Sequence, residues 1–341
     1  MLRSLVLHIG DPDAGAAALR AALAGPLGRG VCAAASSGRL DPALARFAQK
    51  AARRGAATGL LSIEPPAGVR PLRLRRLLAT HFPDLAPEHP PHLAPEHPPQ
   101  QPPQQPGPLR IVAYLRPHAD RLCALHAAAV AAGRCDAPLE AFLDALEAEG
   151  GLGSAARLAP WREVFGPAFV LRPMLAAELT GGDVVQDFLA LALPGARRPG
   201  PEPAPEPGLP GTLSAADTEV LRRLRLSLHD RPAELRVRTV QHLAGLLAAD
   251  PDPQAGPAVL SRDLAQRLLG ACREDAAALD AAFFPDRPVM LPALEALPGR
   301  AEAAAAQPGP DALRLVGIFA ALAADLTASG TGPDPAAPGE D

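Results

Sequence analysis

A candidate phosphate-binding loop follows the first apolar run of the chain. Gly10 and Gly15 have the G-x-x-x-x-G spacing of loops that wrap phosphate groups, and a helix beginning near Gly15 would direct unpaired N–H groups at an anion. Such a loop continues with a lysine and a hydroxyl, but Ala16 and Ala17 follow here. Asp13 places a carboxylate inside the turn, where it would repel phosphate. These residue types argue against a nucleoside triphosphate site.

The segments around this loop predict alternating strands and helices. Short apolar runs indicate buried strands, and a helical apolar period, as at Leu19 and Leu23, indicates helices. The expected strands are 5–10, 31–35, 58–64, 109–116 and 169–172. The expected helices among them are 14–24, 41–54 (with Asp41 and Pro42 at its start), 71–82 and 118–132. This alternation predicts an α/β fold in three layers with a mostly parallel sheet.

Two low-complexity stretches interrupt this pattern. The region 83–108 is rich in Pro, Gln, Glu and His and repeats LAPEHPP at 85–91 and 93–99, which predicts an exposed loop. Beyond a second Pro-rich stretch, helices are expected at 215–228 (capped by Ser214), 232–248, 261–283 and 311–326. The predicted organisation is an α/β domain at 1–195 with the loop 83–108 inserted, a linker at 196–212, a helical C-terminal region at 213–328 and a disordered tail at 329–341.

The composition narrows the classes of function. Apolar residues make up 48% but aromatic residues only 3%, so the core must consist mostly of Leu, Ala and Val. A net charge of −4 gives no case for nucleic-acid binding by the whole chain. The four cysteines lack CxxC spacing, and the His and Glu of the repeats would chelate only weakly, so no metal site is expected. Without an apolar segment of membrane or signal-peptide length, a cytoplasmic protein with no membrane partner is expected.

The opening segment LVLHIGDPDAGAAALRAAL is similar to the first strand, loop and helix of bacterial sulfotransferase-like P-loop proteins. The motif of that family runs HIG-T-x-K-T-G-[ST]-[ST]-x-L-[QR]. The matching positions are His8, Ile9, Gly10, Gly15 and Leu19. The departures are Asp13 at the lysine position and Ala16 and Ala17 at the hydroxyl positions. The resemblance implies a fold of the P-loop nucleotide-hydrolase type.

Four further segments continue the resemblance in the same order. LLSIE at 60–64 is similar to the end of the family's second strand. The segment 111–130 is similar to the strand and helix that bind a 3′-phosphate; Arg116 matches, but Ala124 replaces the serine eight residues later. The segment 161–193 resembles the family's W-x-x-x-F-G…V-R-P…L-x-G-G-D-V-V-x-D-F-L pattern. Finally, 260–285 resembles the family's C-terminal helical stretch.

Other residues of these segments are expected to be structural. Trp161 and Phe165, one helical turn apart, predict core packing. Arg172 is assigned a structural role, and Asp183 is expected to cap the helix that follows it. Cys123 is interpreted as an ordinary buried helix residue. The basic segment 70–76 is interpreted as a solvated helix face, with an anionic partner as the alternative.

The resemblance implies a cofactor and a set of site residues. The cofactor is 3′-phosphoadenosine 5′-phosphosulfate, whose sulfuryl group the family transfers to a hydroxyl, often on a carbohydrate. Arg116 and Ala124 would face the 3′-phosphate, and Glu64 would stand near the acceptor as a catalytic group. The positions at the 5′ end would be Gly10, Asp13, Gly15, Ala16 and Ala17.

The departures from the motif predict that sulfuryl transfer is impaired or lost. Deleting a single preorganised donor costs about 3–4 kcal/mol of transition-state stabilisation, and this chain lacks the lysine and both hydroxyls. Arg20, Arg29 or Arg75 could supply a replacement cation. The first hypothesis is therefore a degenerate sulfotransferase with a carbohydrate or small-molecule acceptor. The alternative is a non-catalytic binding or scaffold protein that keeps the fold and contacts a protein partner, for example through the Pro-rich loop.

Overall fold

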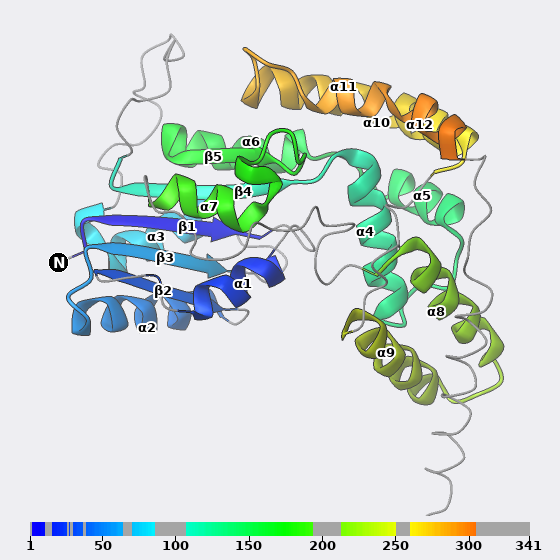
Figure 1. The fold of residues 1–341 in the computed structure, drawn as a ribbon, viewed down its shortest axis with the longest axis horizontal. Helices are drawn as coiled ribbons and strands as arrows, with labels where there is room; N and C mark the ends of the chain where they lie inside the picture. The colour runs from blue at the N-terminus through cyan, green and yellow to red at the C-terminus, as the bar shows by residue number, and fades with distance from the viewer. Residues whose placement is uncertain are drawn as a thin grey trace, which may run out of the picture.

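The computed structural model describes residues 2–10, 16–25, 27, 30–36, 39–63, 70–85, 107–193, 213–249 and 260–304, which carry colour in Figure 1. Several predicted features lie outside these residues. They include Asp13, Gly15 and Glu64 of the expected site, most of the Pro-rich loop, the linker, the helix expected at 311–326 and the tail.

Five parallel strands form a single sheet in the order β2–β3–β1–β4–β5. The strands are β1 (Ser4–Ile9), β2 (Val31–Ser36), β3 (Thr58–Ile63), β4 (Leu109–Leu115) and β5 (Phe169–Pro173). The sequence predicts all five, because a strand buried on both faces of a parallel sheet is a nearly continuous apolar run. The central strand is β1, which pairs with β3 on one side and β4 on the other.

Helices cover both faces of this sheet and complete an α/β fold. On one face α1 (Ala16–Ala24) and α7 (Val184–Ala192) share a buried cluster with Val6 and Val112. On the other face α2 (Leu40–Arg53), α3 (Pro71–His81) and α6 (Ala155–Phe165) pack around Leu7 and Ile111. The two faces bury alternate side chains of the same strands, as a sheet between two helical layers requires.

Two groups of C-terminal helices pack on the α/β part, one at each end of α4 (His118–Ala131) (Figure 1). α8 (Ala215–Ser227) and α9 (Ala233–Ala249) form a cluster with Val130 near the end of α4. α10 (Arg262–Phe283), α11 (Met290–Glu295) and α12 (Leu297–Ala304) lie near its start and extend the main core. Phe283 of α10 meets Phe169 of β5 edge-on, with ring centroids 6.1 Å apart. α5 (Leu139–Ala148) packs beside α4.

Two of the helix caps agree with the prediction from sequence, and one departs from it. Asp183 accepts a hydrogen bond from the Gln186 N–H at 2.8 Å, as predicted. Ser214 caps α8, also as predicted, and Ser261 caps α10. The prediction that Asp41 caps α2 is wrong, because that helix begins one residue earlier and Arg39 is its N-cap. The Asp41 carboxylate instead accepts a hydrogen bond from His81 Nε2 at 2.7 Å, which ties α2 to α3.

Candidate functional site

The carboxyl ends of β1 and β4 lie side by side. His8 is in register with Val112 and Ile9 with Ala113, so the chain leaves both strands at one edge of the sheet. Gly10 follows β1 and donates a hydrogen bond from its N–H to the Ile63 carbonyl at 3.0 Å. Ligands of open α/β sheets bind outside the carboxyl ends of the strands, and this edge is therefore the candidate site.

Of the motif positions at the 5′ end, Gly10, Ala16 and Ala17 lie in the described backbone. Ala16 begins α1 and is 2% exposed, so the hydroxyl position of the motif holds a buried methyl group. Ala17 follows it in the helix, while Asp13 and Gly15 lie outside the described residues. The helix start can still offer backbone N–H groups to an anion. Within the described residues, no motif side chain of this loop can donate to a phosphate.

The three arginines that could supply a replacement cation lie in different parts of the chain. Arg20 lies on α1 and its charge acts on His8 near the end of β1. Arg75 lies on α3, which covers the face of the sheet opposite to α1, and Arg29 is outside the described residues. Arg20 is thus the described candidate whose charge reaches this strand end.

The His8 ring is buried beneath the candidate site. Its Nδ1 lies 2.9 Å from Ser62 Oγ, and its ring centroid is 5.8 Å from that of Tyr114 and 6.1 Å from that of Phe188. His8 Nε2 is buried and has no hydrogen-bond partner. Burial, reinforced by the charge of Arg20, lowers the pKa of His8 to about 3. The imidazole is therefore neutral near pH 7 and supplies no positive charge to the site.

Arg116 follows β4 directly and is 9% exposed. Asp120 lies four residues later on α4. Desolvation raises the pKa of its carboxyl group, and the positive charges of Arg116 and Arg300 oppose that rise. Arg116 therefore shares its electrostatic environment with a carboxylate. Ala124, one turn further along α4, is half-buried and presents a methyl group where the motif has a hydroxyl.

A buried network fixes the neighbouring end of β5. The Asp187 carboxylate accepts hydrogen bonds from Tyr114 Oη at 2.9 Å and from Arg172 Nε and Nη2 at 2.9 and 2.6 Å. Thr180 adds its backbone N–H and its hydroxyl at 3.0 and 3.1 Å. Burial alone would raise the pKa of Asp187, but these donors, led by Arg172, hold it below its usual value. The structural role predicted for Arg172 is confirmed, and Asp187 is the partner that the sequence did not identify.

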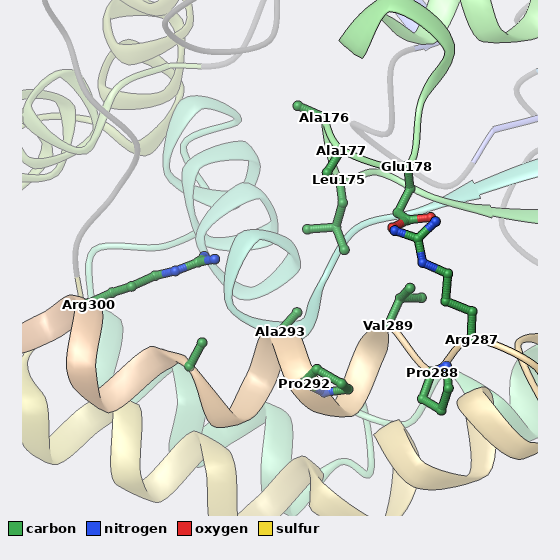
Figure 2. Close-up of a pocket in the computed structure, with 11 residues that line it drawn as sticks. Leu175, Ala176, Ala177, Glu178, Arg287, Pro288, Val289, Pro292, Ala293 and Arg300 are labelled. Atoms are coloured by element: carbon green, nitrogen blue, oxygen red, sulfur yellow. The ribbon is translucent and has the colours of Figure 1, made fainter.

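A hollow of about 480 Å³ lies beside this network (Figure 2). One wall is the segment after β5, and the other is formed by α11 and α12 with the loop before them. Glu178 and Arg287 face each other across one end, with Oε1 and Nη2 2.8 Å apart. At the other end Arg300 extends toward α4, where its charge acts on Asp120. Sequence reasoning missed Arg287 and Arg300, which come to this edge only through tertiary packing of the C-terminal helices.

Two predictions about single residues are supported by these surroundings. Trp161 and Phe165 are buried and stacked, with ring centroids 6.0 Å apart. Burial and the nearby Asp120 raise the pKa of Cys123 to about 12, so its thiol is unreactive near neutral pH. His81, which precedes the Pro-rich loop, is engaged with Asp41, and the His and Glu of the LAPEHPP repeats lie outside the described residues.

Searches of family models, of curated proteins and of solved structures give no match to this chain. Among the described helices, none combines the length and apolar character that a membrane span requires. In the same part of the chain, no three His, Cys, Asp or Glu side chains gather as a metal site would need.

The described residues fit the implied nucleotide cofactor poorly. Among the described positions that match the motif, Arg116 carries the phosphate-binding side chain, and Ala16 and Ala124 carry methyl groups in place of hydroxyls. A 3′-phosphate bound at Arg116 would also lie near the carboxylate of Asp120. We therefore derive no reaction step through this cofactor.

Proposed function

We propose that this chain is a sulfotransferase-like protein whose sulfuryl-transfer chemistry is impaired or lost. The observation that carries the proposal is the adjacency of β1 and β4, which brings Gly10 and Arg116 to one edge of the sheet. The resemblance assigns these residues to opposite ends of one nucleotide, so an adjacent pair of strands is what the proposal requires. A central β1 followed by α1 is likewise consistent with a fold of the P-loop type.

The impairment of sulfuryl transfer follows from the residue types at the motif positions. Sulfuryl transfer needs a cation on the charge that develops on the leaving group, and Asp13 occupies the position of that cation in the motif. The positive charge of Arg20, on α1, helps to lower the pKa of His8, which is neutral. Backbone N–H groups and Arg116 remain, and they support weak binding of a nucleotide but not fast transfer.

A second candidate function is a non-catalytic binding protein with the same fold. The observation that favours it is the electrostatic coupling between Arg116 and Asp120, because a carboxylate beside the arginine lowers its attraction for phosphate. In that case the carboxyl edge serves a partner other than the nucleotide.

Titration of the full chain with 3′-phosphoadenosine 5′-phosphate, followed by calorimetry and thermal shift, separates the two functions. We expect weak binding that disappears in Arg116→Ala, survives partly in Arg116→Lys and is unchanged in Arg231→Ala, an exposed arginine in the turn between α8 and α9. Circular dichroism of each variant establishes that the fold persists. No binding at millimolar nucleotide would contradict the sulfotransferase-like proposal and favour the second candidate.

A repair variant tests the reason given for the loss of activity. Asp13→Lys combined with Ala16→Ser and Ala17→Thr restores the side chains of the motif, and charge-assisted bonds to phosphate should raise nucleotide affinity by more than about tenfold. The matched control is Glu274→Lys with Ala21→Ser and Ala22→Thr, which makes the same change in net charge and adds the same two hydroxyl residues outside the loop. Equal affinity of the repaired and control variants would show that the loop is not a nucleotide site.

A further inference from the structure

Exposed basic side chains are concentrated on α2 and α3, two helices that pack against each other on one face of the sheet. Arg46 and Arg53 are seven residues apart, and this spacing places both on one stripe along α2. In the described segments 39–63 and 70–85, the carboxylates are Asp41, which is bound to His81, and Asp84. In the same two segments, the arginines without an ion pair or a side-chain hydrogen bond are Arg39, Arg46, Arg53, Arg54, Arg70, Arg73, Arg75 and Arg76. A chain of net charge −4 thus concentrates unpaired positive charge on one pair of helices.

α3 carries an apolar side chain in the middle of this charge. Leu74 and Leu78 of α3 are buried against the core. Leu72 lies on the opposite side of the helix and is 56% exposed, the largest value among the exposed large apolar side chains of the described residues. Arg75 and Arg76 follow it at helical spacings of three and four residues, which makes them its neighbours on the helix surface.

We propose that this surface, defined by the exposed basic residues of α2 and α3 together with Leu72, docks the protein on an anionic phospholipid bilayer. Basic residues on an amphipathic helix attract acidic headgroups, and an apolar side chain among them enters the headgroup region. Arginine guanidinium groups also bind lipid phosphates in a bidentate manner. The contact is peripheral, with α2 and α3 lying against the lipid headgroups.

The observations favour a bilayer over a nucleic acid. Binding to single-stranded nucleic acid uses exposed aromatic side chains as stacking platforms, and the aromatic residues of the described α2–α3 pair, Phe47 and Phe82, are buried. An exposed leucine gains nothing from a phosphate backbone but gains free energy in a lipid headgroup layer. The proposal does not depend on nucleotide binding, because α3 and the cluster of α1 lie on opposite faces of the sheet.

Sedimentation of the full chain with vesicles tests the proposal. We expect binding to vesicles of phosphatidylcholine mixed with phosphatidylserine, little binding to phosphatidylcholine alone, and release at high salt. Arg73→Glu with Arg76→Glu should weaken binding by more than about tenfold, since one basic residue near an acidic bilayer contributes roughly a factor of five. Leu72→Ser, which leaves the charge unchanged, should weaken it by roughly fivefold.

The matched control is Arg231→Glu with Arg238→Glu. Both arginines are exposed, the first just before α9 and the second within it, and reversing their charges changes the net charge by the same amount. An equal loss in this control would overturn the proposal, because binding would then reflect net charge alone. So would vesicle binding that ignores lipid charge, or that Leu72→Ser leaves intact. Binding of double-stranded DNA or RNA that depends on Arg73 and Arg76, without vesicle binding, would assign the surface to nucleic acid instead.

Discussion

Asp275 of α10 and His118 of α4 form a hydrogen-bonded pair, with Oδ2 and Nε2 2.8 Å apart, which fastens the C-terminal helices to the α/β part. The same carboxylate accepts hydrogen bonds from the backbone N–H groups of Ser154 and Ala155 at 2.9–3.0 Å, at the start of α6. One side chain therefore joins three helices that are far apart in the sequence. It also supplies the cap that α6 lacks from its own residues.

Asp275→Ala should lower the free energy of unfolding by about 2–4 kcal/mol, because it leaves buried donors of His118 and of the α6 start without an acceptor. The matched control is Glu274→Ala, an exposed neighbour on the same helix, which should change stability by less than about 0.5 kcal/mol. Urea denaturation measures both. Equal losses in the two variants would remove Asp275 as the link between the helices.

His8 should make the native state sensitive to acid. Its pKa is about 3 in the folded chain, below the ordinary value of 6.5, so the unfolded chain binds more protons between these values. Its contribution to stability is complete above about pH 6.5 and falls as the pH decreases toward 3, by about 1.4 kcal/mol per pH unit. His8→Phe, which suits the surrounding rings of Tyr114 and Phe188, should flatten this part of the profile. Denaturant unfolding from pH 7 to pH 5 measures how the free energy of unfolding changes with pH in the native chain and in His8→Phe. Equal changes in both would show that His8 is not the group responsible.

Asp187 should be the most sensitive position of the network at the end of β5. Asp187→Ala leaves the Arg172 guanidinium and the Tyr114 hydroxyl without their acceptor, and breaking a buried pair of this kind costs about 3–5 kcal/mol. Tyr114→Phe removes one neutral donor and should cost only about 1–2 kcal/mol. A double-mutant cycle of Tyr114→Phe and Asp187→Ala should show strong coupling in thermal or urea unfolding. Additive losses would mean that the two side chains act independently.

Gly133 should tolerate alanine less well than Gly150. Both have a positive φ, 69° and 65°, so both substitutions carry the same left-handed backbone strain of about 1 kcal/mol. A Cβ at Gly133 would lie 3.1 Å from the Val237 Cα of α9, whereas nothing lies within 4 Å of one at Gly150. Because the Val237 backbone must shift, Gly133→Ala should cost at least about 1 kcal/mol more than Gly150→Ala. Comparing their thermal midpoints isolates the contact from the strain, and equal values would exclude the contact.

The strands and most longer helices could be predicted from the sequence because their apolar pattern is local. α5 and α11 could not. α5 buries Leu143 alone, which is too little apolar periodicity to recognise. α11 has six residues, and its start is held by the Asp280 carboxylate of α10, which accepts from the N–H groups of Val289, Met290 and Leu291. A cap supplied by another helix leaves no local signal.

The residues of the candidate site likewise divide into those that carry a local sequence signal and those that do not. Gly10 and Arg116 could be identified because each lies in a recognisable strand–helix motif. The coupling of Arg116 to Arg300 through Asp120 could not, since Arg300 reaches this edge only after α10, α11 and α12 have packed. Charges that modify a site from distant parts of the chain depend on tertiary structure, which residue spacing does not encode.

The packing of Phe283 on Phe169 has a consequence for how the chain folds. The side of β5 that meets α10 stays uncovered until the last described helices have left the ribosome, so a nascent chain ending at the linker exposes Phe169 and Trp161 to solvent. Contacts between such distant segments are closed late and slowly. The C-terminal helices therefore complete the apolar core of the α/β part and cover surface that it would otherwise expose.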